Sequence, residues 1–130
     1  MMYVWVALGS AIGGAARLWC SEVIAASYLG SFPLALLVIN IIGSFLVGFI
    51  AALTFPAELF MISSEVKTFL MIGICGGYTT FSSFSLATLK LIQDGQLMQA
   101  GLNILLSVIL CLLAVWLGTY LAALINQFNR

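Results

Sequence analysis

The segment between residues 73 and 85 holds the side chains best suited to bind an ion. It contains three glycines, paired threonines, two phenylalanines and three serines, namely Gly73, Gly76, Gly77, Thr79, Thr80, Phe81, Ser82, Ser83, Phe84 and Ser85. Gly-Gly followed closely by Thr-Thr disfavours a helix, so we expect a break here. Carbonyls freed by a break are suitable ligands for a hard cation such as Na⁺. The spacing of Gly73 and Gly77 equally indicates close helix packing, and both interpretations stay open.

The residues after the threonine pair could bind an anion without a formal positive charge. Phe81 and Phe84 are three positions apart and therefore share one helix face. The positive edge of a phenyl ring attracts an anion, and the hydroxyls of Ser82, Ser83 and Ser85 can donate hydrogen bonds beside the rings. Such weak binding permits release, which conduction requires. The alternative is that the rings pack in a core while the hydroxyls bond to carbonyls of their own helix.

Other polar side chains also interrupt apolar segments. The amide of Asn40 needs partners in an apolar setting, so it either joins helices or faces a conducting cavity. Asn103, Ser107 and Cys111 are spaced by four and form a mildly polar stripe that could face residues 73–85 across a pore. Arg17 lies about 24 Å of helix from the first residue, where it can extend to the membrane interface or attract anions into a vestibule.

The composition decides which kind of protein must position these residues. Hydrophobic residues make up 64% of the 130-residue chain and charged residues only 6%, too few to cover a soluble domain. Soluble enzymes, nucleic-acid-binding proteins and disordered chains are therefore excluded. The chain has no histidine, and its three cysteines show no CxxC spacing, which argues against a transition-metal site. We expect an integral membrane protein that is not an enzyme.

Four apolar runs are long enough to cross a bilayer, which takes about 20 residues as a helix. They predict an all-α fold of four transmembrane helices in a single domain covering 1–130, with spans at about 3–26, 34–55, 67–92 and 100–125. Gly76 follows Lys67 by nine positions, or about 14 Å of helical rise. In a hydrocarbon core about 30 Å thick, the expected break in the third helix therefore lies near the middle of the membrane.

The cations divide equally between the two sides of the membrane. Lys67 and Arg130 lie on the side of the termini, while Arg17 and Lys90 lie on the opposite side. Because no positive-inside bias results, both orientations should insert, and an antiparallel dimer with a twofold axis in the membrane plane becomes possible. The alternative is that four cations are too few for their distribution to have meaning.

Together these motifs resemble those of the Fluc (CrcB-type) fluoride ion channel family of microorganisms. The matching residues are Gly13, Gly14 and Arg17 in the first span, Asn40, Gly43, Ser44, Phe45 and Gly48 in the second, and Gly76, Gly77, Thr79, Thr80, Phe81, Ser82, Phe84 and Ser85 in the third. The resemblance covers nearly the whole chain. It implies a dual-topology antiparallel homodimer in the inner (plasma) membrane, with two pores for passive fluoride efflux.

The resemblance also implies roles for individual residues. A structural Na⁺ at the dimer centre would be bound by the backbone carbonyls of Gly76 and Thr79. The anion pathway would comprise Asn40, Phe81, Phe84 and the hydroxyls of Ser82, Ser83, Ser85 and Ser107. Arg17 and Asn103 would lie at a vestibule. Some family members have a tyrosine near the position of Asn103 and an acidic residue where this chain has Ala87, so the vestibule differs in detail.

Two other interpretations compete with the channel. A small multidrug-resistance-type, proton-coupled exporter also has four short helices and dual topology, but it needs a carboxylate within the membrane. The four carboxylates of this chain, Glu22, Glu58, Glu65 and Asp94, all lie at expected helix ends or loops. A purely structural subunit of a larger complex would leave the polar residues of the second and third spans unexplained. Fluoride efflux from liposomes that contain only this protein separates the three interpretations.

Overall fold

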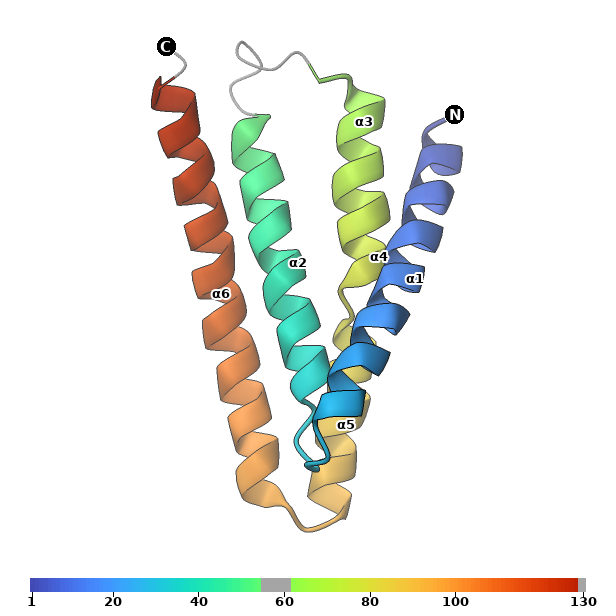
Figure 1. Cartoon of the computed structure of the whole chain (residues 1–130), viewed down its shortest axis with the longest axis vertical. Coiled ribbons are helices and arrows are strands. Elements are labelled where there is room, and N and C mark those ends of the chain that lie inside the picture. Colours follow the sequence, from blue (N-terminus) through green and yellow to red (C-terminus); the bar gives the residue numbers. More distant parts are fainter. Residues whose placement is uncertain (55–61, 129–130) are drawn as a thin grey trace.

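The computed structural model describes residues 1–54 and 62–128, which form helices joined by short connections (Figure 1). The elements in chain order are α1 (Met2–Ser27), α2 (Leu34–Leu53), α3 (Ser64–Thr68), the π-helical segment η1 (Phe69–Cys75), α4 (Gly76–Tyr78), α5 (Phe81–Gln93) and α6 (Leu97–Phe128). No strand occurs in these described ranges. The prediction of an all-α protein is therefore confirmed.

Helices occupy each of the four predicted ranges. α1, α2 and α6 coincide with the first, second and fourth ranges to within about three residues, and α3 to α5 together occupy the third. Phe55, at the end of the predicted second span, lies outside the described residues, as do Glu58 and Arg130. Unlike a simple transmembrane helix, the third range contains a π-helical segment and an interruption at Thr79 and Thr80.

Three helical segments in the described chain are long and apolar enough to cross a membrane. They are Leu34–Leu53, Ser64–Gln93 and Leu97–Phe128. α1 is also long, with 26 residues, but Arg17, Glu22 and several glycines lower its hydropathy, and it is not one of the three. Large apolar side chains such as Leu105, Leu112 and Trp116 are exposed along α6, as expected where lipid is the solvent. The chain is a multi-pass membrane protein.

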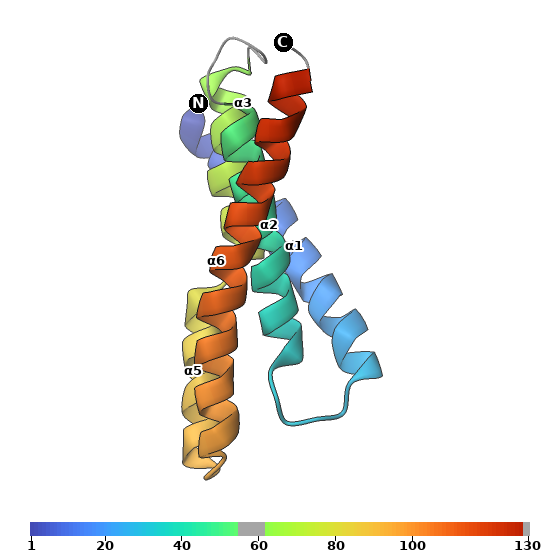
Figure 2. The ribbon, with the colours of Figure 1, turned by 90° about the vertical axis from the view of Figure 1, so that its left-hand side faces the viewer.

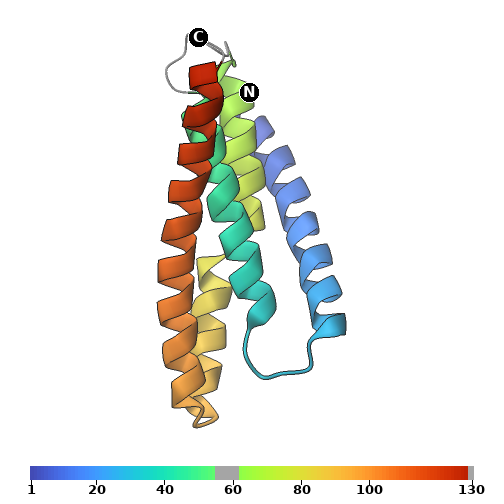
Figure 3. The same ribbon diagram turned by 60° about the vertical axis from the view of Figure 1, so that its left-hand side comes forward.

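The helices pack as neighbouring pairs. α2 lies alongside α6 (Figures 1 and 3), and α1 packs against η1 and α4. α5 packs mainly against the first part of α6, below the interruption (Figure 2), and also contacts α2. The start of α1 and the end of α6 lie at the same end of the molecule (Figure 1).

Glycines set the close approach of α1 to η1 and α4. A methyl group at Gly73 would lie 2.9 Å from the Gly9 Cα, and one at Gly77 would lie 2.7 Å from the Ser10 carbonyl oxygen. A methyl group at Gly13 would overlap the Ile74 carbonyl oxygen. The interpretation of Gly73 and Gly77 as a close-packing face is therefore correct.

A tight turn returns the chain from α5 to α6. Gly95 has a φ of +74°, which only glycine adopts without strain. The Gly95 N–H donates to the Ile92 carbonyl at 3.0 Å, and the Gln96 N–H donates to the Leu91 carbonyl at 2.8 Å. This pattern of bonds is a Schellman motif, which ends α5 and sets α6 antiparallel beside it.

Candidate functional site

The interruption between α4 and α5 lies at the threonines, not at the glycines. Gly76 and Gly77 are helical, whereas Thr79 has φ −80° and ψ 157° and Thr80 has φ −153° and ψ 114°. The sequence predicted a break at this motif but did not separate the glycines from the threonines. Gly77 is used instead for contact with α1, where a larger residue would not fit.

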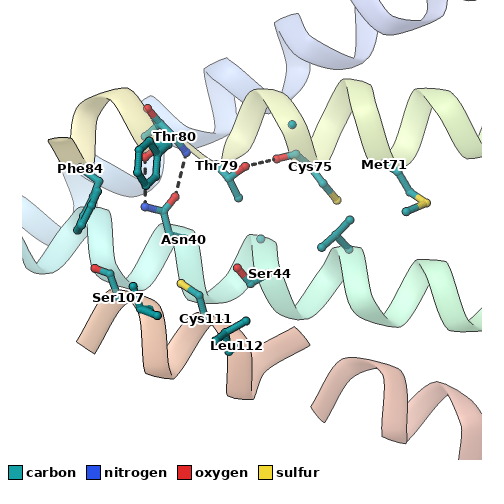
Figure 4. A pocket seen from close by; sticks show the side chains of 15 residues that line it. Asn40, Ser44, Met71, Cys75, Thr79, Thr80, Phe84, Ser107, Cys111 and Leu112 are labelled. Atoms are coloured by element: carbon teal, nitrogen blue, oxygen red, sulfur yellow. Dashed lines mark hydrogen bonds between the residues drawn. The ribbon is translucent and has the colours of Figure 1, made fainter. Parts of the chain in front are cut away.

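Asn40 of α2 binds the backbone of the interruption. Its Oδ1 accepts the Thr80 N–H at 2.9 Å, and its Nδ2 donates to the Thr80 carbonyl at 3.3 Å (Figure 4). Thr80 is only 7% exposed, so both of its backbone groups need partners inside the protein. A side-chain amide has both N–H donors and a carbonyl acceptor in a single plane, so it can pair with both groups at once. Asn40 therefore joins α2 to the interruption, one of the two roles expected for it.

Thr80 also starts α5. Its Oγ1 accepts the Ser83 N–H at 3.2 Å and donates to the Ser83 Oγ at 3.0 Å. This is an N-cap, in which a threonine side chain replaces a missing helical acceptor. Thr80 had no assigned role in the sequence prediction. The spacing of a Thr three residues before a Ser, ahead of an apolar helix, was the signal that could have indicated it.

These two contacts free the carbonyls of Gly76 and Thr79. In an unbroken helix those carbonyls would accept from the N–H groups four residues later, which belong to Thr80 and Ser83. The Thr80 N–H donates to Asn40 instead, and the Ser83 N–H donates to the Thr80 side chain. Two backbone oxygens three residues apart are thus left for other partners, and they are the pair predicted to bind a cation.

A cavity of about 480 Å³ lies beside the interruption, between α2, α6 and the third helical range. Six of the predicted site residues line it, namely Asn40, Gly76, Thr79, Phe81, Phe84 and Ser107. Figure 4 shows Asn40 directed at Thr80, with Phe84 and Ser107 nearby. No charged side chain is among the lining residues, which also include Ser44, Met71, Cys75, Thr80 and Cys111. An ion in this cavity would therefore meet hydroxyl, amide, aromatic, sulfur-containing and aliphatic groups, but no charged side chain.

The two phenylalanines are neighbours, as their spacing predicts. Their ring centroids are 5.4 Å apart and the ring planes make an angle of 40°. Phe81 is 79% exposed in the isolated chain, whereas Phe84 is half-buried. Phe81 therefore lines the cavity without being packed in the core of this chain.

The remaining predicted residues do not line the cavity. Ser85 donates to the Phe81 carbonyl at 3.0 Å, as the alternative interpretation of the serines expects. Ser83 bonds to Thr80, and Ser82 is exposed. Arg17 is half-buried on α1. Asn103, the other residue predicted at a vestibule, is only 1% exposed and lies in the contact between α5 and α6. An anion role for these residues stays a prediction.

The described acidic residues lie away from the cavity. Glu22, Glu65 and Asp94 are exposed and none lines it. Within residues 1–54 and 62–128, no group of three or more His, Cys, Asp or Glu side chains could bind a metal ion. The chemistry available at the cavity is therefore hydrogen bonding and aromatic contact, with backbone carbonyls at its edge.

The chain is similar in sequence to proteins of a known family. Residues 4–119 match the profile of the family described as CrcB-like protein, Camphor Resistance (CrcB). The chain is 51% identical over 129 residues to a fluoride-specific ion channel FluC of Methylocella silvestris, covering 99% of this chain and 98% of that protein. It is 57% identical over 127 residues to a FluC of Paramagnetospirillum magneticum, covering 98% and 99%. It is 50% identical over 127 residues to a FluC of Rhodospirillum rubrum.

Proposed function

Because this chain belongs to the CrcB-like protein family, we propose that it is a fluoride-selective channel through which fluoride leaves the cytoplasm passively. The observation that carries the proposal is the uncharged cavity where Asn40, Phe81, Phe84 and Ser107 meet. Fluoride enters a cell as neutral HF, ionises and is trapped. The negative-inside membrane potential drives an anion outward, so a passive pathway lowers cytoplasmic fluoride. Selectivity is needed because a chloride leak would dissipate that potential.

The cavity offers hydrogen-bond donors that replace those of the water molecules a small anion loses on entry. One hydrogen of the Asn40 amide is committed to the Thr80 carbonyl, which leaves the second for an anion. Ser107, Phe81 and Phe84 also line the cavity, and we assign a hydroxyl donor to Ser107 and ring edges with partial positive charge to the two phenylalanines. Without a lysine or arginine in the cavity the anion binds weakly enough to leave, which conduction requires.

The interruption would lie near the middle of the bilayer. The helical segments before it run from Ser64 to Tyr78, and α5 continues from Phe81 to Gln93. The two parts are similar in length, so a span that crosses the membrane places Thr79 and Thr80 deep within it. Irregular backbone is tolerated at that depth where it is enclosed in protein or lines a cavity, and both conditions fit here.

A structural Na⁺ at the centre of a homodimer is part of the same proposal. The carbonyls of Gly76 and Thr79 have lost their helical donors, and two copies would supply four oxygens, a suitable set for a monovalent hard cation. Gly76 is exposed, and a methyl group there would approach only the Met71 carbonyl oxygen, at 3.8 Å. A second copy can therefore reach this face of the chain. The even distribution of cations supports antiparallel pairing of two such copies, with α1 as the fourth span of each.

The proposal is tested with purified protein in liposomes loaded with potassium fluoride. A fluoride electrode records release after a potassium ionophore is added. We expect rapid fluoride release without a proton gradient, and no comparable chloride release from matched vesicles. Absence of fluoride release from vesicles containing the assembled protein would overturn the proposal. A proton-coupled exporter is not favoured, because none of the described carboxylates lines the cavity.

A further inference from the structure

A second polar cluster lies behind the cavity, in the contact between α5 and α6. Thr88 of α5 is 7% exposed, and Asn103 and Ser107 of α6 are 1% and 8% exposed. Asn103 and Ser107 are one helical turn apart, so their Cβ atoms are about 5–6 Å from each other. Ser107 also lines the cavity, whereas Thr88 and Asn103 do not. The cluster thus connects the cavity to the interior of the helix pair.

The hydrogen-bond directions in this cluster follow from the number of protons available. Thr88 has one hydroxyl proton and donates it to the Phe84 carbonyl at 2.8 Å. Its Oγ1 can therefore only accept from Asn103, at 2.9 Å, so the atom of Asn103 that faces it must be Nδ2. This fixes the orientation of the amide, which distances alone would leave open. The Asn103 Oδ1 therefore points away from Thr88.

Two oxygens of the cluster lack partners. Among the residues that the structure describes, neither the Asn103 Oδ1 nor the Ser107 Oγ has a hydrogen-bond partner. Both are enclosed, and a buried polar oxygen without a partner is costly. The Asn103 Oδ1 can only accept a hydrogen bond, so whatever satisfies it must be a donor. An anion is excluded from that position because it would face a carbonyl oxygen.

We propose that a single buried water molecule is bound between Asn103 and Ser107. It donates one hydrogen to the Asn103 Oδ1 and the other to the Ser107 Oγ. A water at about 2.8 Å from each oxygen bridges the spacing of one helical turn, and the cavity at Ser107 gives it a way in. Because Ser107 accepts from the water, its own proton is free to point into the cavity.

Through this water, Asn103 acts on the Ser107 hydroxyl without contacting the anion itself. In terms of the channel proposed above, on which this step rests, Asn103 is a positioning residue that turns the Ser107 hydroxyl into a donor toward the anion. Without the water, the Ser107 hydroxyl would bond back to its own helix, as serines in helices do. The chain of hydrogen bonds from the Phe84 carbonyl through Thr88 and Asn103 to the water then holds the Ser107 hydroxyl in one orientation.

The water is tested directly by a structure of the intact, lipid-embedded assembly at a resolution that resolves ordered waters. Samples are prepared with and without fluoride, because the two species scatter alike. We expect density within hydrogen-bond distance of both the Asn103 Oδ1 and the Ser107 Oγ in both samples. Density present only with fluoride, or a Ser107 hydroxyl bonded directly to Asn103 with no density between them, overturns the proposal. This result does not depend on whether the protein conducts fluoride.

The positioning role is tested by flux. Asn103→Leu removes the acceptor, and we expect fluoride efflux per assembled protein to fall by about tenfold, which corresponds to about 1.4 kcal/mol. Asn126→Leu is the matched control, since Asn126 is also buried on α6, donates to the Ala52 carbonyl and has an unpaired Oδ1, but is remote from the cavity. We expect its efflux to equal that of the parent. Parental efflux in an assembled Asn103→Leu protein would refute the positioning role.

A second pair of variants covers the case in which Asn103→Leu does not assemble. Thr88→Val removes the acceptor that orients the Asn103 amide, while Thr88→Ser retains it. We expect reduced efflux in Thr88→Val and recovery in Thr88→Ser, and equal efflux in the two would contradict the proposal. If the unmodified protein itself releases no fluoride, the channel proposal is wrong, and the density measurement alone still decides whether the water is bound.

Discussion

Replacing Asn40 by leucine tests the most informative contact in the structure. Leucine has the same number and branching of side-chain heavy atoms as asparagine but can neither donate nor accept a hydrogen bond. The change leaves the Thr80 N–H and carbonyl, now bonded at 2.9 Å and 3.3 Å, without partners in a residue that is 7% exposed. We therefore expect two effects, a less stable protein and loss of fluoride efflux.

The stability effect can be bounded from the two bonds. Hydrogen bonds between membrane helices contribute about 0.6 kcal/mol on average and at most about 1.7 kcal/mol. Leaving a buried donor or acceptor unpaired costs about 1–3 kcal/mol. The 3.3 Å bond is long, so the shorter bond dominates. We expect the free energy of unfolding to fall by about 1–3 kcal/mol, enough to weaken the protein without unfolding it.

Three measurements separate an effect on stability and assembly from an effect on fluoride efflux. Unfolding is followed by titration with sodium dodecyl sulfate in mixed micelles, assembly by size-exclusion chromatography, and efflux with a fluoride electrode. Asn126→Leu, which loses one bond of 3.0 Å to the Ala52 carbonyl, should lose about half as much stability and keep its efflux. An Asn40→Leu protein that assembles and releases fluoride at the parental rate would refute the reasoning, because neither the interruption nor the anion would then need the amide.

Three further outcomes are expected. Phe81→Ile and Phe84→Ile should each lower efflux by about tenfold while the assembly persists, since they remove the ring edge but keep an apolar group; parental efflux in both would mean that the rings only pack. Thr79→Ser should leave efflux nearly unchanged because the proposed Na⁺ ligand is a backbone carbonyl, whereas replacing Na⁺ by a large organic cation during purification should reduce activity; indifference to Na⁺ would count against the site. A tag at the C-terminus that can be detected from either side of the membrane should reveal both orientations, and two or three lysines added beside Arg130 should fix that end inside; a single orientation of the unmodified chain would rule out self-pairing in antiparallel fashion.

Much of the fold and part of the site were predictable from sequence. The scarcity of charge dictates a lipid-embedded protein, and the lengths of the apolar runs dictate helices, because a backbone in hydrocarbon must satisfy its own hydrogen bonds. The motif from Gly76 to Phe84 indicated both a break and an anion site. Its chemistry is local, and residues three or four apart on a helix share a face whatever surrounds them.

Only the tertiary structure decided where the break falls and which of the hydroxyl-bearing residues line the cavity. The sequence allowed the helix to break at the glycines, but α1 packs closely on Gly73 and Gly77, and both remain helical. Asn40, 40 positions away along the chain, supplies the donor and acceptor that let Thr80 leave the helix instead. Ser107 reaches the cavity because α6 packs along α2, whereas Ser85, on the same helix as the phenylalanines, bonds to its own backbone. Which partner a polar group meets depends on the neighbouring helix, and that information is absent from the spacing of residues along a single helix.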